Sequence, residues 1–434
     1  MIISDFKISI LYTAAYFISF MAGRAGISAL SAICLIGMAV FFYYTEKKRT
    51  NELLNLRGLM ALGILGGEGI ARLQLSSLST VWTESTWLSF YLFYLVFFMV
   101  SGAAERFTES RALLSKKHLS LYKRKISDTA LHRSIIILVI IISWSAFFYE
   151  AANLGFIPLF TVDMPHAYSY FHLKGIHYFT TLAVLVPAVS VLYLEHRKKQ
   201  DLKPDAVSIL GIFLPLLLSV LLVSRFQFMF AAILAVFAAA SSGRKYKLWQ
   251  VITIFMLMVA VYVTITIARA HSVEYLNSIF EMKNPDTPIF ITQPYMYIAN
   301  NYDNFNVMTR ELTVHSNGLK MLYPFTTLTG LKFLNPDFGM GFPLFTTKEE
   351  LTTVTLIYDA WYDFGIPGVV LFAAVIGLIT GFILYEHKRD SNPFAKLIYA
   401  ELAFYFSVSF FTTWFSNPST WFYLGFSVLF YLVY

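Results

Sequence analysis

Long apolar segments alternate with short polar ones along almost the whole chain. The apolar segments run for about 17 to 25 residues, the length that an α-helix needs to cross about 30 Å of hydrocarbon. They are continuously apolar rather than alternating, which favours helices over a closed β-barrel. The pattern predicts twelve membrane-spanning helices, at residues 7–23, 27–44, 58–76, 85–104, 134–151, 176–195, 206–223, 226–242, 248–268, 366–386, 394–414 and 419–434. We therefore expect an all-α polytopic membrane protein.

One polar interval, residues 269–353, is much longer than the other connections. It divides the chain into a region of nine spans (1–268), one large loop (269–353) and a region of three spans (354–434). We expect Pro294 to start a helix in this loop, because proline is favoured at the first helical position. An aromatic stripe on one face and a polar back suit a helix lying at the membrane interface. The stripe consists of Tyr295, Ile298, Tyr302 and Phe305.

Composition and charge agree with this topology. Hydrophobic residues make up 57% of the chain and charged residues 14%, against about 25% charged in a soluble domain. Lysine and arginine concentrate in five connections, which all fall on one face when the twelve spans alternate; they are residues 45–57, 105–133, 196–205, 243–247 and 387–393. That face is cytoplasmic by the positive-inside rule. The large loop is then extracytoplasmic, both termini are cytoplasmic, and the net charge of +7 does not indicate nucleic acid.

The sequence contains no phosphate-binding P-loop, no dinucleotide-binding glycine motif, no HExxH and no paired CxxC. The single cysteine, Cys34, excludes an intramolecular disulfide. Histidines on the expected outer face lack the spacing of a metal site, so we expect neither a metal nor a cofactor. These histidines are His166, His172, His177, His271 and His315.

Four arginines are expected at or near the outer face: Arg72, Arg225, Arg269 and Arg310. Arginine is uncommon on that face, so the set requires anionic partners, and guanidinium groups bind phosphate oxygens in pairs. Alternatives remain open for two of them. Arg72 pairs with Glu68, one turn earlier on the same helix, or faces a ligand. Arg225, in a tight turn between two spans, reaches lipid phosphate or binds a ligand.

Arginines, asparagines and aromatic rings on an outer face suit a sugar linked to a lipid pyrophosphate. The reaction would be a displacement at an anomeric carbon. The leaving pyrophosphate needs positive charge, and the acceptor hydroxyl needs a general base. From the residue types on this face, the base would be a histidine or a carboxylate.

Several segments, in their order along the chain, resemble the oligosaccharide repeat-unit polymerases, the Wzy-type O-antigen and capsule polymerases. The similarity also covers the topology, with one large outer loop before the last three spans. The segments are Phe148-Tyr-Glu150 with Gly155-Phe-Ile-Pro-Leu-Phe160, Gly175-Ile-His177-Tyr-Phe, Ser224-Arg225, Tyr297-Ile-Ala-Asn-Asn-Tyr-Asp-Asn-Phe305 and Tyr362-Asp363-Phe-Gly365.

The resemblance implies a bacterial inner-membrane glycosyltransferase of GT-C-like fold that works without metal. It would transfer a growing glycan from undecaprenyl pyrophosphate to the terminal sugar of another lipid-linked repeat unit, among membrane lipids and with a chain-length regulator as a further partner. The substrate-binding residues expected are Arg72, Arg225, Arg269, Arg310, His177, Asn301, Tyr302 and Asp363. In related ligases a histidine of the large loop is the base, so the resemblance implies His315 or His271 in that role, with Glu150 as the carboxylate alternative, and no motif chooses among them. An O-antigen ligase uses the same donor and remains an alternative. A lipid-linked sugar flippase is a second alternative, although the chain lacks the two related halves usual in transporters.

Overall fold

The computed structural model describes residues 5–114, 129–161, 167–244, 249–250, 253, 256, 273–334, 338, 341–389 and 392–434. Within these ranges the regular structure is helical, apart from one isolated bridge between Ser76 and Met282. Six of the described helices are long and apolar enough to cross a membrane: Asp5–Arg24, Ser28–Thr50, Glu84–Arg111, Thr129–Leu154, Ile176–Lys199 and Tyr358–Arg389. The chain is therefore an all-helical, multi-pass membrane protein. Most of the expected span 248–268 lies outside the described residues.

The chain folds into two units that interleave along the sequence. Unit 1 comprises residues 1–120, 272–388 and 405–421, and unit 2 comprises residues 121–271, 389–404 and 422–434. Each unit contains candidate spans of its own, so each forms a helical bundle with its own buried interior.

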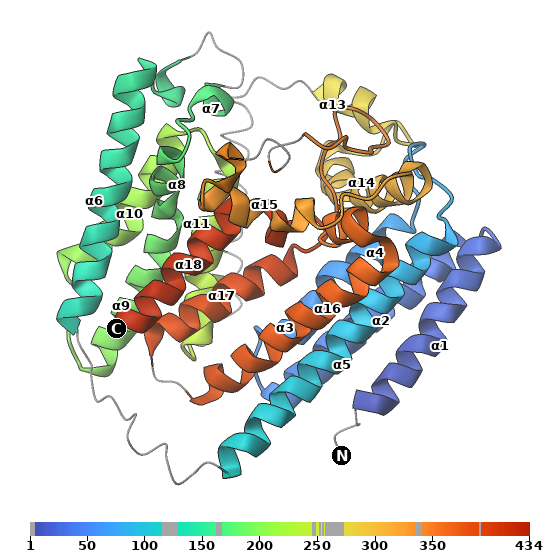
Figure 1. Cartoon of the computed structure of the whole chain (residues 1–434), viewed down its shortest axis with the longest axis horizontal. Helices are drawn as coiled ribbons and strands as arrows, with labels where there is room; N and C mark the ends of the chain where they lie inside the picture. The colour runs from blue at the N-terminus through green and yellow to red at the C-terminus, as the bar shows by residue number, and fades with distance from the viewer. Residues whose placement is uncertain are drawn as a thin grey trace. The chain divides into compact units, whose positions relative to one another are not determined.

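Unit 1 is built around long helices that run side by side (Figure 1). Its elements are α1 (Asp5–Arg24), α2 (Ser28–Thr50), α3 (Leu56–Ala61), the π-turn η1 (Leu62–Gly66), α4 (Gly67–Ala71), α5 (Glu84–Leu114), α13 (Val273–Phe280), α14 (Ile289–Glu311), α15 (Leu319–Leu328), the 3₁₀ turns η5 (Leu331–Phe333) and η7 (Trp414–Ser416), and α16 (Tyr358–Arg389). Helices α5 and α16 approach closely at Gly377 and Gly381, where an added Cβ would lie 3.1 Å and 2.6 Å from backbone oxygens of α5. Small residues at such crossings let membrane helices pack backbone to backbone.

A buried ionic network holds one end of unit 1. The Arg57 guanidinium is fully buried, lies 3.1 Å from Glu46 and 3.4 Å from Asp5, and donates to the Phe98 carbonyl at 3.0 Å. It also lies over the Phe98 ring, 3.8 Å from the ring centroid. A buried charge is tolerated only when it is paired and hydrogen-bonded. The network therefore fastens α1, α2, α3 and α5 together where α1 begins.

The third expected span is helical without a gap from Leu56 to Ala71. Its middle, the π-turn, separates two short α-helices. A π-turn redirects backbone carbonyls away from their usual partners. The Tyr302 hydroxyl, from α14, lies 3.0 Å and 2.7 Å from the carbonyl oxygens of Gly63 and Ile64. Gly67 leaves room for this ring, because an added Cβ would collide with the Tyr302 hydroxyl.

Helix α14 differs from the interfacial helix that the sequence predicted. It begins at Ile289, so Pro294 lies inside it, and its polar face is buried together with its aromatic face. Asparagine side chains on that face bind backbone groups of neighbouring segments: Asn304 donates to the carbonyls of Leu351 and Thr353 at 2.7 Å and 2.8 Å. The polar positions therefore serve internal hydrogen bonding rather than contact with water.

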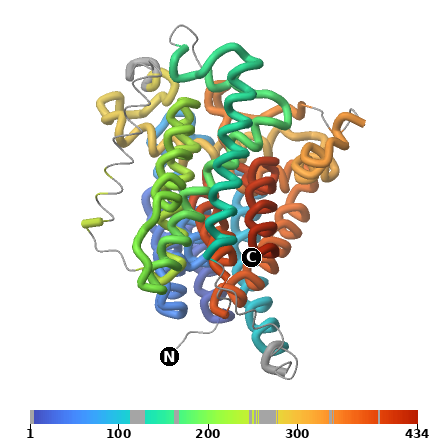
Figure 2. The backbone as a smooth tube through the Cα atoms, turned by 90° about the vertical axis from the view of Figure 1, so that its left-hand side faces the viewer, coloured from blue at the N-terminus to red at the C-terminus, as the bar shows by residue number. Residues whose placement is uncertain are grey.

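Unit 2 contains α6 (Thr129–Leu154), η3 (Pro158–Phe160), α7 (Ala167–Tyr170), α8 (Ile176–Thr181), η4 (Leu182–Leu185), α9 (Val186–Lys199), α10 (Ala206–Leu221), α11 (Arg225–Ser241) and most of α17 (Pro393–Ser407) and α18 (Pro418–Val433). Helices α9, α10 and α11 run alongside one another, as the green tubes in Figure 2 show. A tight turn, in which Val223 has a φ of 54°, joins α10 to α11, as the sequence predicted.

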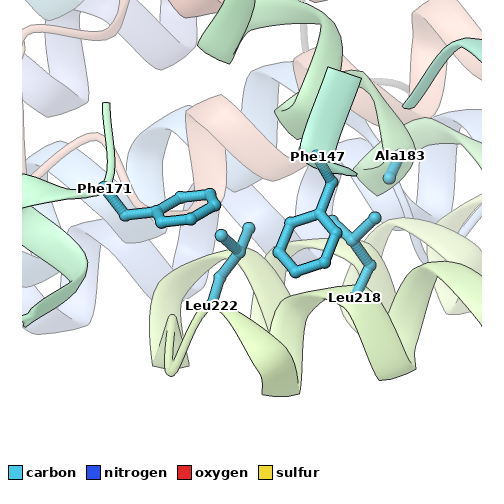
Figure 3. Packing of buried hydrophobic residues seen from close by; sticks show 5 residues of the cluster. All are labelled: Phe147, Phe171, Ala183, Leu218 and Leu222. Carbon is cyan, nitrogen blue, oxygen red and sulfur yellow. The ribbon is translucent and has the colours of Figure 1, made fainter. Parts of the chain in front are cut away.

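An apolar cluster supports one end of unit 2 (Figure 3). Phe147 of α6 packs with Phe171, Ala183, Leu218 and Leu222, which come from the loop after α7, from η4 and from the end of α10. Because Phe147 lies three residues before Glu150 on α6, this cluster forms the apolar support beneath the polar group described next.

Candidate functional site

The best-formed polar site of unit 2 centres on Glu150, in the last two turns of α6. Glu150 lies on the buried face of that helix, where buried positions recur at helical spacing, and its exposed fraction is 0%. Its carboxylate accepts hydrogen bonds from the Leu173 backbone N–H at 3.0 Å and from the Thr180 hydroxyl at 2.6 Å. Nδ1 of His177 lies 3.2 Å from both carboxylate oxygens.

Local backbone geometry brings His177 to this carboxylate. Gly175, with a φ of 83°, ends the loop after α7 and precedes the first residue of α8. Only glycine adopts this conformation readily, because it lacks a Cβ atom. His177 follows as the second residue of α8, and its backbone N–H donates to the Leu173 carbonyl at 3.1 Å. The imidazole is thereby directed back toward the end of α6.

This arrangement has a definite chemical consequence. A carboxylate beside Nδ1 holds the proton on that nitrogen and leaves the lone pair of Nε2 available. The His177 side chain is 14% exposed, so a small reactive group can reach it. Glu150 is fully buried and both of its oxygens already accept hydrogen bonds. The pair therefore suits general-base chemistry with His177 as the base and Glu150 as the residue that orients it.

Further polar side chains surround the pair. The His172 ring lies 5.1 Å from the His177 ring and the Tyr168 ring 6.1 Å from it, centroid to centroid. Gln227, in the first turn of α11, donates to the Tyr168 hydroxyl at 2.9 Å. The same turn begins with Arg225, which is half-buried and follows the helix-capping residue Ser224. The structure thus links the turn that carries Arg225 to the surroundings of His177.

In unit 1, Arg72 follows directly on α4 and is only 3% exposed. Its guanidinium lies 5.0 Å and 5.2 Å from the ring centroids of Trp82 and Trp87. Glu68 instead accepts a hydrogen bond from the Tyr16 hydroxyl at 2.6 Å. Among the described residues Arg72 forms no ion pair, and its buried Nε has no hydrogen-bond partner. The intrahelical pair with Glu68 that the sequence allowed does not form, and indole rings occupy that place instead.

His315 and Asp363 lie together in unit 1. Nδ1 of His315 is 3.0 Å from the Tyr362 carbonyl, and the ring lies beside Gly365, which has a φ of 62° at a kink of α16. Asp363 accepts hydrogen bonds from the backbone N–H groups of Lys320 and Met321, at 3.1 Å and 2.9 Å, in the first turn of α15. Asp363 therefore caps α15, which accounts for its burial.

Two further expected substrate-binding residues have internal roles. Asn301 donates to the carbonyls of Tyr297 and Phe410, both at 2.7 Å. Tyr302 is fully buried on the π-turn carbonyls. Arg310 forms an exposed pair with Glu311 at 2.9 Å. The site proposed below does not include these three residues.

Three expected residues lie outside the described ranges: His166, Arg269 and His271. Within the described ranges there is no group of three or more histidine, cysteine, aspartate or glutamate side chains placed to hold a metal ion.

Sequence reasoning missed two side chains of the unit 2 site, Thr180 and Gln227. Thr180 follows His177 by three residues, so on one helix both face the same side. Gln227 stands two residues after Arg225 at the start of an apolar helix. An uncharged polar residue at the start of an apolar helix could have identified Gln227 as a candidate from the sequence.

The fold and the site together define a multi-pass helical membrane protein with a carboxylate–imidazole pair at the end of one of its candidate spans. A model of the family described as "Putative O-antigen polymerase" matches residues 69–412. The chain belongs to the O-antigen polymerase family. A search of curated proteins and a search of solved structures gave no match. The family implies a polymerase that acts in polysaccharide biosynthesis on lipid-linked oligosaccharides.

Proposed function

We propose that this protein polymerises oligosaccharide repeat units linked to undecaprenyl pyrophosphate, on the outer face of the bacterial cytoplasmic membrane. The observation that carries the proposal is the Glu150–His177 pair within a chain of the O-antigen polymerase family. Both residues lie in segments whose resemblance to repeat-unit polymerases was noted from the sequence, 148–160 and 175–179.

In this reaction His177 would act as the general base. Its Nε2 takes the proton from the hydroxyl of the acceptor sugar as that oxygen attacks the anomeric carbon of the donor glycan. The new bond forms between this oxygen and the anomeric carbon, and the bond from that carbon to the pyrophosphate oxygen breaks. Glu150 stabilises the imidazolium that results, because its carboxylate faces the protonated Nδ1.

The departing pyrophosphate carries the charge that develops in this step and needs cations nearby. Arg225 is our candidate for this role, because it begins α11 in the same turn as Gln227, which contacts Tyr168 beside His177. Backbone N–H groups at the start of α11 favour an anion in the same place.

Arg72 is a second candidate cation, in unit 1. Its Nε has no hydrogen-bond partner among the described residues, and indole rings rather than carboxylates contact it. A buried guanidinium without an ion pair retains charge for an anionic ligand. We therefore keep Arg72 as a proposed phosphate contact, whereas Arg269 and His271 remain proposals from the sequence alone.

Loop charge supports the orientation. The end of α6 that carries Glu150 is one span away from the basic connections 105–133 and 196–205, which the positive-inside rule places in the cytoplasm. The Glu150–His177 pair would then face outward, where lipid-linked repeat units are joined. A chain-length regulator remains a proposed partner from the resemblance.

The test uses purified full-length protein and lipid-linked repeat units extracted from cells that lack this polymerase. We expect the wild-type protein to produce a ladder of longer glycans and Arg225→Gln to produce none, with both proteins inserted in membranes. An O-antigen ligase would instead attach finished chains to a different acceptor and leave the ladder unchanged. Failure of the wild-type protein to elongate any lipid-linked repeat would refute the proposal.

A further inference from the structure

Gln227 is a buried side chain in which only one of the two polar amide atoms forms a hydrogen bond with the described residues. The residue is 6% exposed and lies in the first turn of α11. One atom of its amide, Nε2, donates to the Tyr168 hydroxyl at 2.9 Å. The other atom, Oε1, is buried and has no hydrogen-bond partner among the described residues.

An amide atom left without a partner in a buried place is costly. The desolvation penalty of an unsatisfied polar group is about 1–3 kcal/mol. Methionine or leucine would fill the same place in α11 without this cost, and the helix is otherwise strongly apolar in this region. The polar side chain is therefore explained best by a polar partner that arrives with a ligand.

The surroundings indicate what kind of ligand this is. Gln227 is held by Tyr168, whose ring lies beside the ring of His177, the proposed base, with the centroids 6.1 Å apart. Arg225 begins the same helical turn and supplies the positive charge. An amide is neutral, so it does not neutralise a phosphate. It matches a neutral group that both donates and accepts hydrogen bonds, and a sugar hydroxyl has that property.

We propose that Gln227 binds a hydroxyl group of the glycan. One turn of α11 would then bind both parts of the substrate, the pyrophosphate at Arg225 and the sugar at Gln227. This inference rests on the proposed function, because it assumes that the ligand at His177 is a glycan. It holds for either orientation of the amide, since a hydroxyl pairs with a carbonyl oxygen and with an amino group alike.

Tyr168 acts as a positioning residue in this scheme. Its hydroxyl accepts a hydrogen bond from Nε2 of Gln227 and thereby fixes the direction in which Oε1 of the same amide points. Its ring packs beside the apolar cluster of Phe147 and Phe171, which holds it in place. Removing the Tyr168 hydroxyl alone leaves Gln227 present but free to rotate.

The experiment measures binding of two separate probes to the full-length protein by ligand-observed NMR. One probe is the free oligosaccharide repeat unit, cleaved from its lipid by mild acid, and the other is inorganic pyrophosphate. The variants are Gln227→Met, which keeps length and apolar volume, and Arg225→Gln. Gln200→Met, at an exposed glutamine beyond the far end of α9, is the matched control.

We expect Gln227→Met to weaken oligosaccharide binding roughly two- to tenfold, the range for one neutral hydrogen bond, with pyrophosphate binding unchanged. Arg225→Gln should weaken pyrophosphate binding more than oligosaccharide binding. Tyr168→Phe should weaken oligosaccharide binding in the same direction by a smaller factor, and Gln200→Met should change neither. If Gln227→Met lowers the melting temperature, its weaker binding could reflect misfolding, and the oligosaccharide affinity of Tyr168→Phe then tests the inference.

An unchanged oligosaccharide affinity in both Gln227→Met and Tyr168→Phe overturns the inference, and so does equal weakening of both probes, which indicates local disruption. The proposed function is tested apart from this. If the wild-type protein binds the oligosaccharide through Gln227 but elongates no lipid-linked repeat, the polymerase proposal fails while the binding site stands. If it elongates normally and Gln227→Met binds like wild type, only the inference fails.

Discussion

Helix α14 of unit 1 and the Glu150 site of unit 2 use their buried polar side chains in different ways. In unit 1 the polar atoms of α14 mostly bind the protein itself: Asn301 and Asn304 hold backbone carbonyls, and Tyr302 lies on the π-turn. In unit 2 the Glu150–His177 pair leaves Nε2 of the imidazole available, and one amide atom of Gln227 has no partner in the part of the chain that the structure describes. Satisfied groups stabilise a fold, whereas groups held in place but left unsatisfied are suited to a ligand.

This contrast shows why residue type alone misleads in a membrane protein. Asparagine, tyrosine and aspartate in the segment Tyr295–Phe305 have the appearance of a sugar-binding site. In the structure the asparagines and Tyr302 donate to loop and π-turn carbonyls, and Asp303 accepts from Thr80 and Trp82, so these side chains take the place of water. Arg72 differs from these side chains, since two indole rings lie beside its guanidinium and its Nε has no hydrogen-bond partner among the described residues.

The largest expected effect is that of His177→Ala. If His177 is the base, its loss should lower kcat for elongation by about 10²- to 10⁴-fold, the usual contribution of general-base catalysis. His315→Ala in unit 1 should remain within a few-fold of wild type, because Nδ1 of His315 faces a backbone carbonyl instead of a carboxylate. The measurement is elongation of lipid-linked repeat units by purified protein. A greater loss of kcat in His315→Ala than in His177→Ala would indicate that the base lies in unit 1.

Glu150→Gln should have the next largest effect. An amide in place of the carboxylate no longer fixes the proton on Nδ1 of His177 or stabilises the imidazolium. We expect kcat to fall by about 10²-fold with KM little changed, because Glu150 is buried and does not touch substrate. Thr180→Val, which removes one hydrogen bond to the same carboxylate, is the milder companion variant. Wild-type kcat in Glu150→Gln would show that the pair is structural.

Tyr302→Phe tests the opposite role in unit 1. Removing this hydroxyl takes one hydrogen bond from the Gly63 and Ile64 carbonyls of the π-turn, which still accept from the Gly67 backbone N–H. We expect a loss of about 0.5–1.5 kcal/mol in stability, seen as a lower melting temperature in detergent, with kcat per folded molecule unchanged. If kcat falls and the melting temperature does not, Tyr302 belongs to the site after all.

The smallest expected effect concerns Asp303, which is buried in unit 1 and accepts hydrogen bonds from Thr80 and from the Trp82 indole N–H at 2.9 Å. Burial raises the pKa of Asp303 to about 6, above the ordinary value of 3.8. Folding then favours the protonated carboxyl, so its contribution to stability is complete below about pH 4 and is lost as pH rises through about 6.

We therefore expect Asp303→Asn to remove a decline in melting temperature between pH 4 and pH 7 that the wild-type protein shows. The amide keeps an oxygen that accepts from Trp82, so the variant should fold. Glu311→Gln, at an exposed carboxyl on the same helix, is the control and should leave the wild-type decline in place. A parallel pH dependence in Asp303→Asn and wild type would show that this carboxyl is already ionised at pH 4.

Much of the fold could be predicted from the sequence, because membrane spans are local. Length and hydropathy of a segment decide whether it can cross a bilayer, and all six candidate membrane helices coincide with predicted spans. The tight turn before Arg225 and the family resemblance were equally visible, since each depends on neighbouring residues. The number of spans, the orientation and the role of the large loop stay predictions.

The pairing of Glu150 with His177 was not visible in the same way. The two residues are 27 positions apart, and both had been singled out, but separately. Only the packing of α8 against the end of α6 joins them, and it turns Glu150 from a candidate base into the proposed partner of one. The inward-facing asparagines of α14 have the same cause. Which backbone groups lack a partner depends on contacts between distant segments, and hydrogen bonding of buried polar groups then decides where each side chain points.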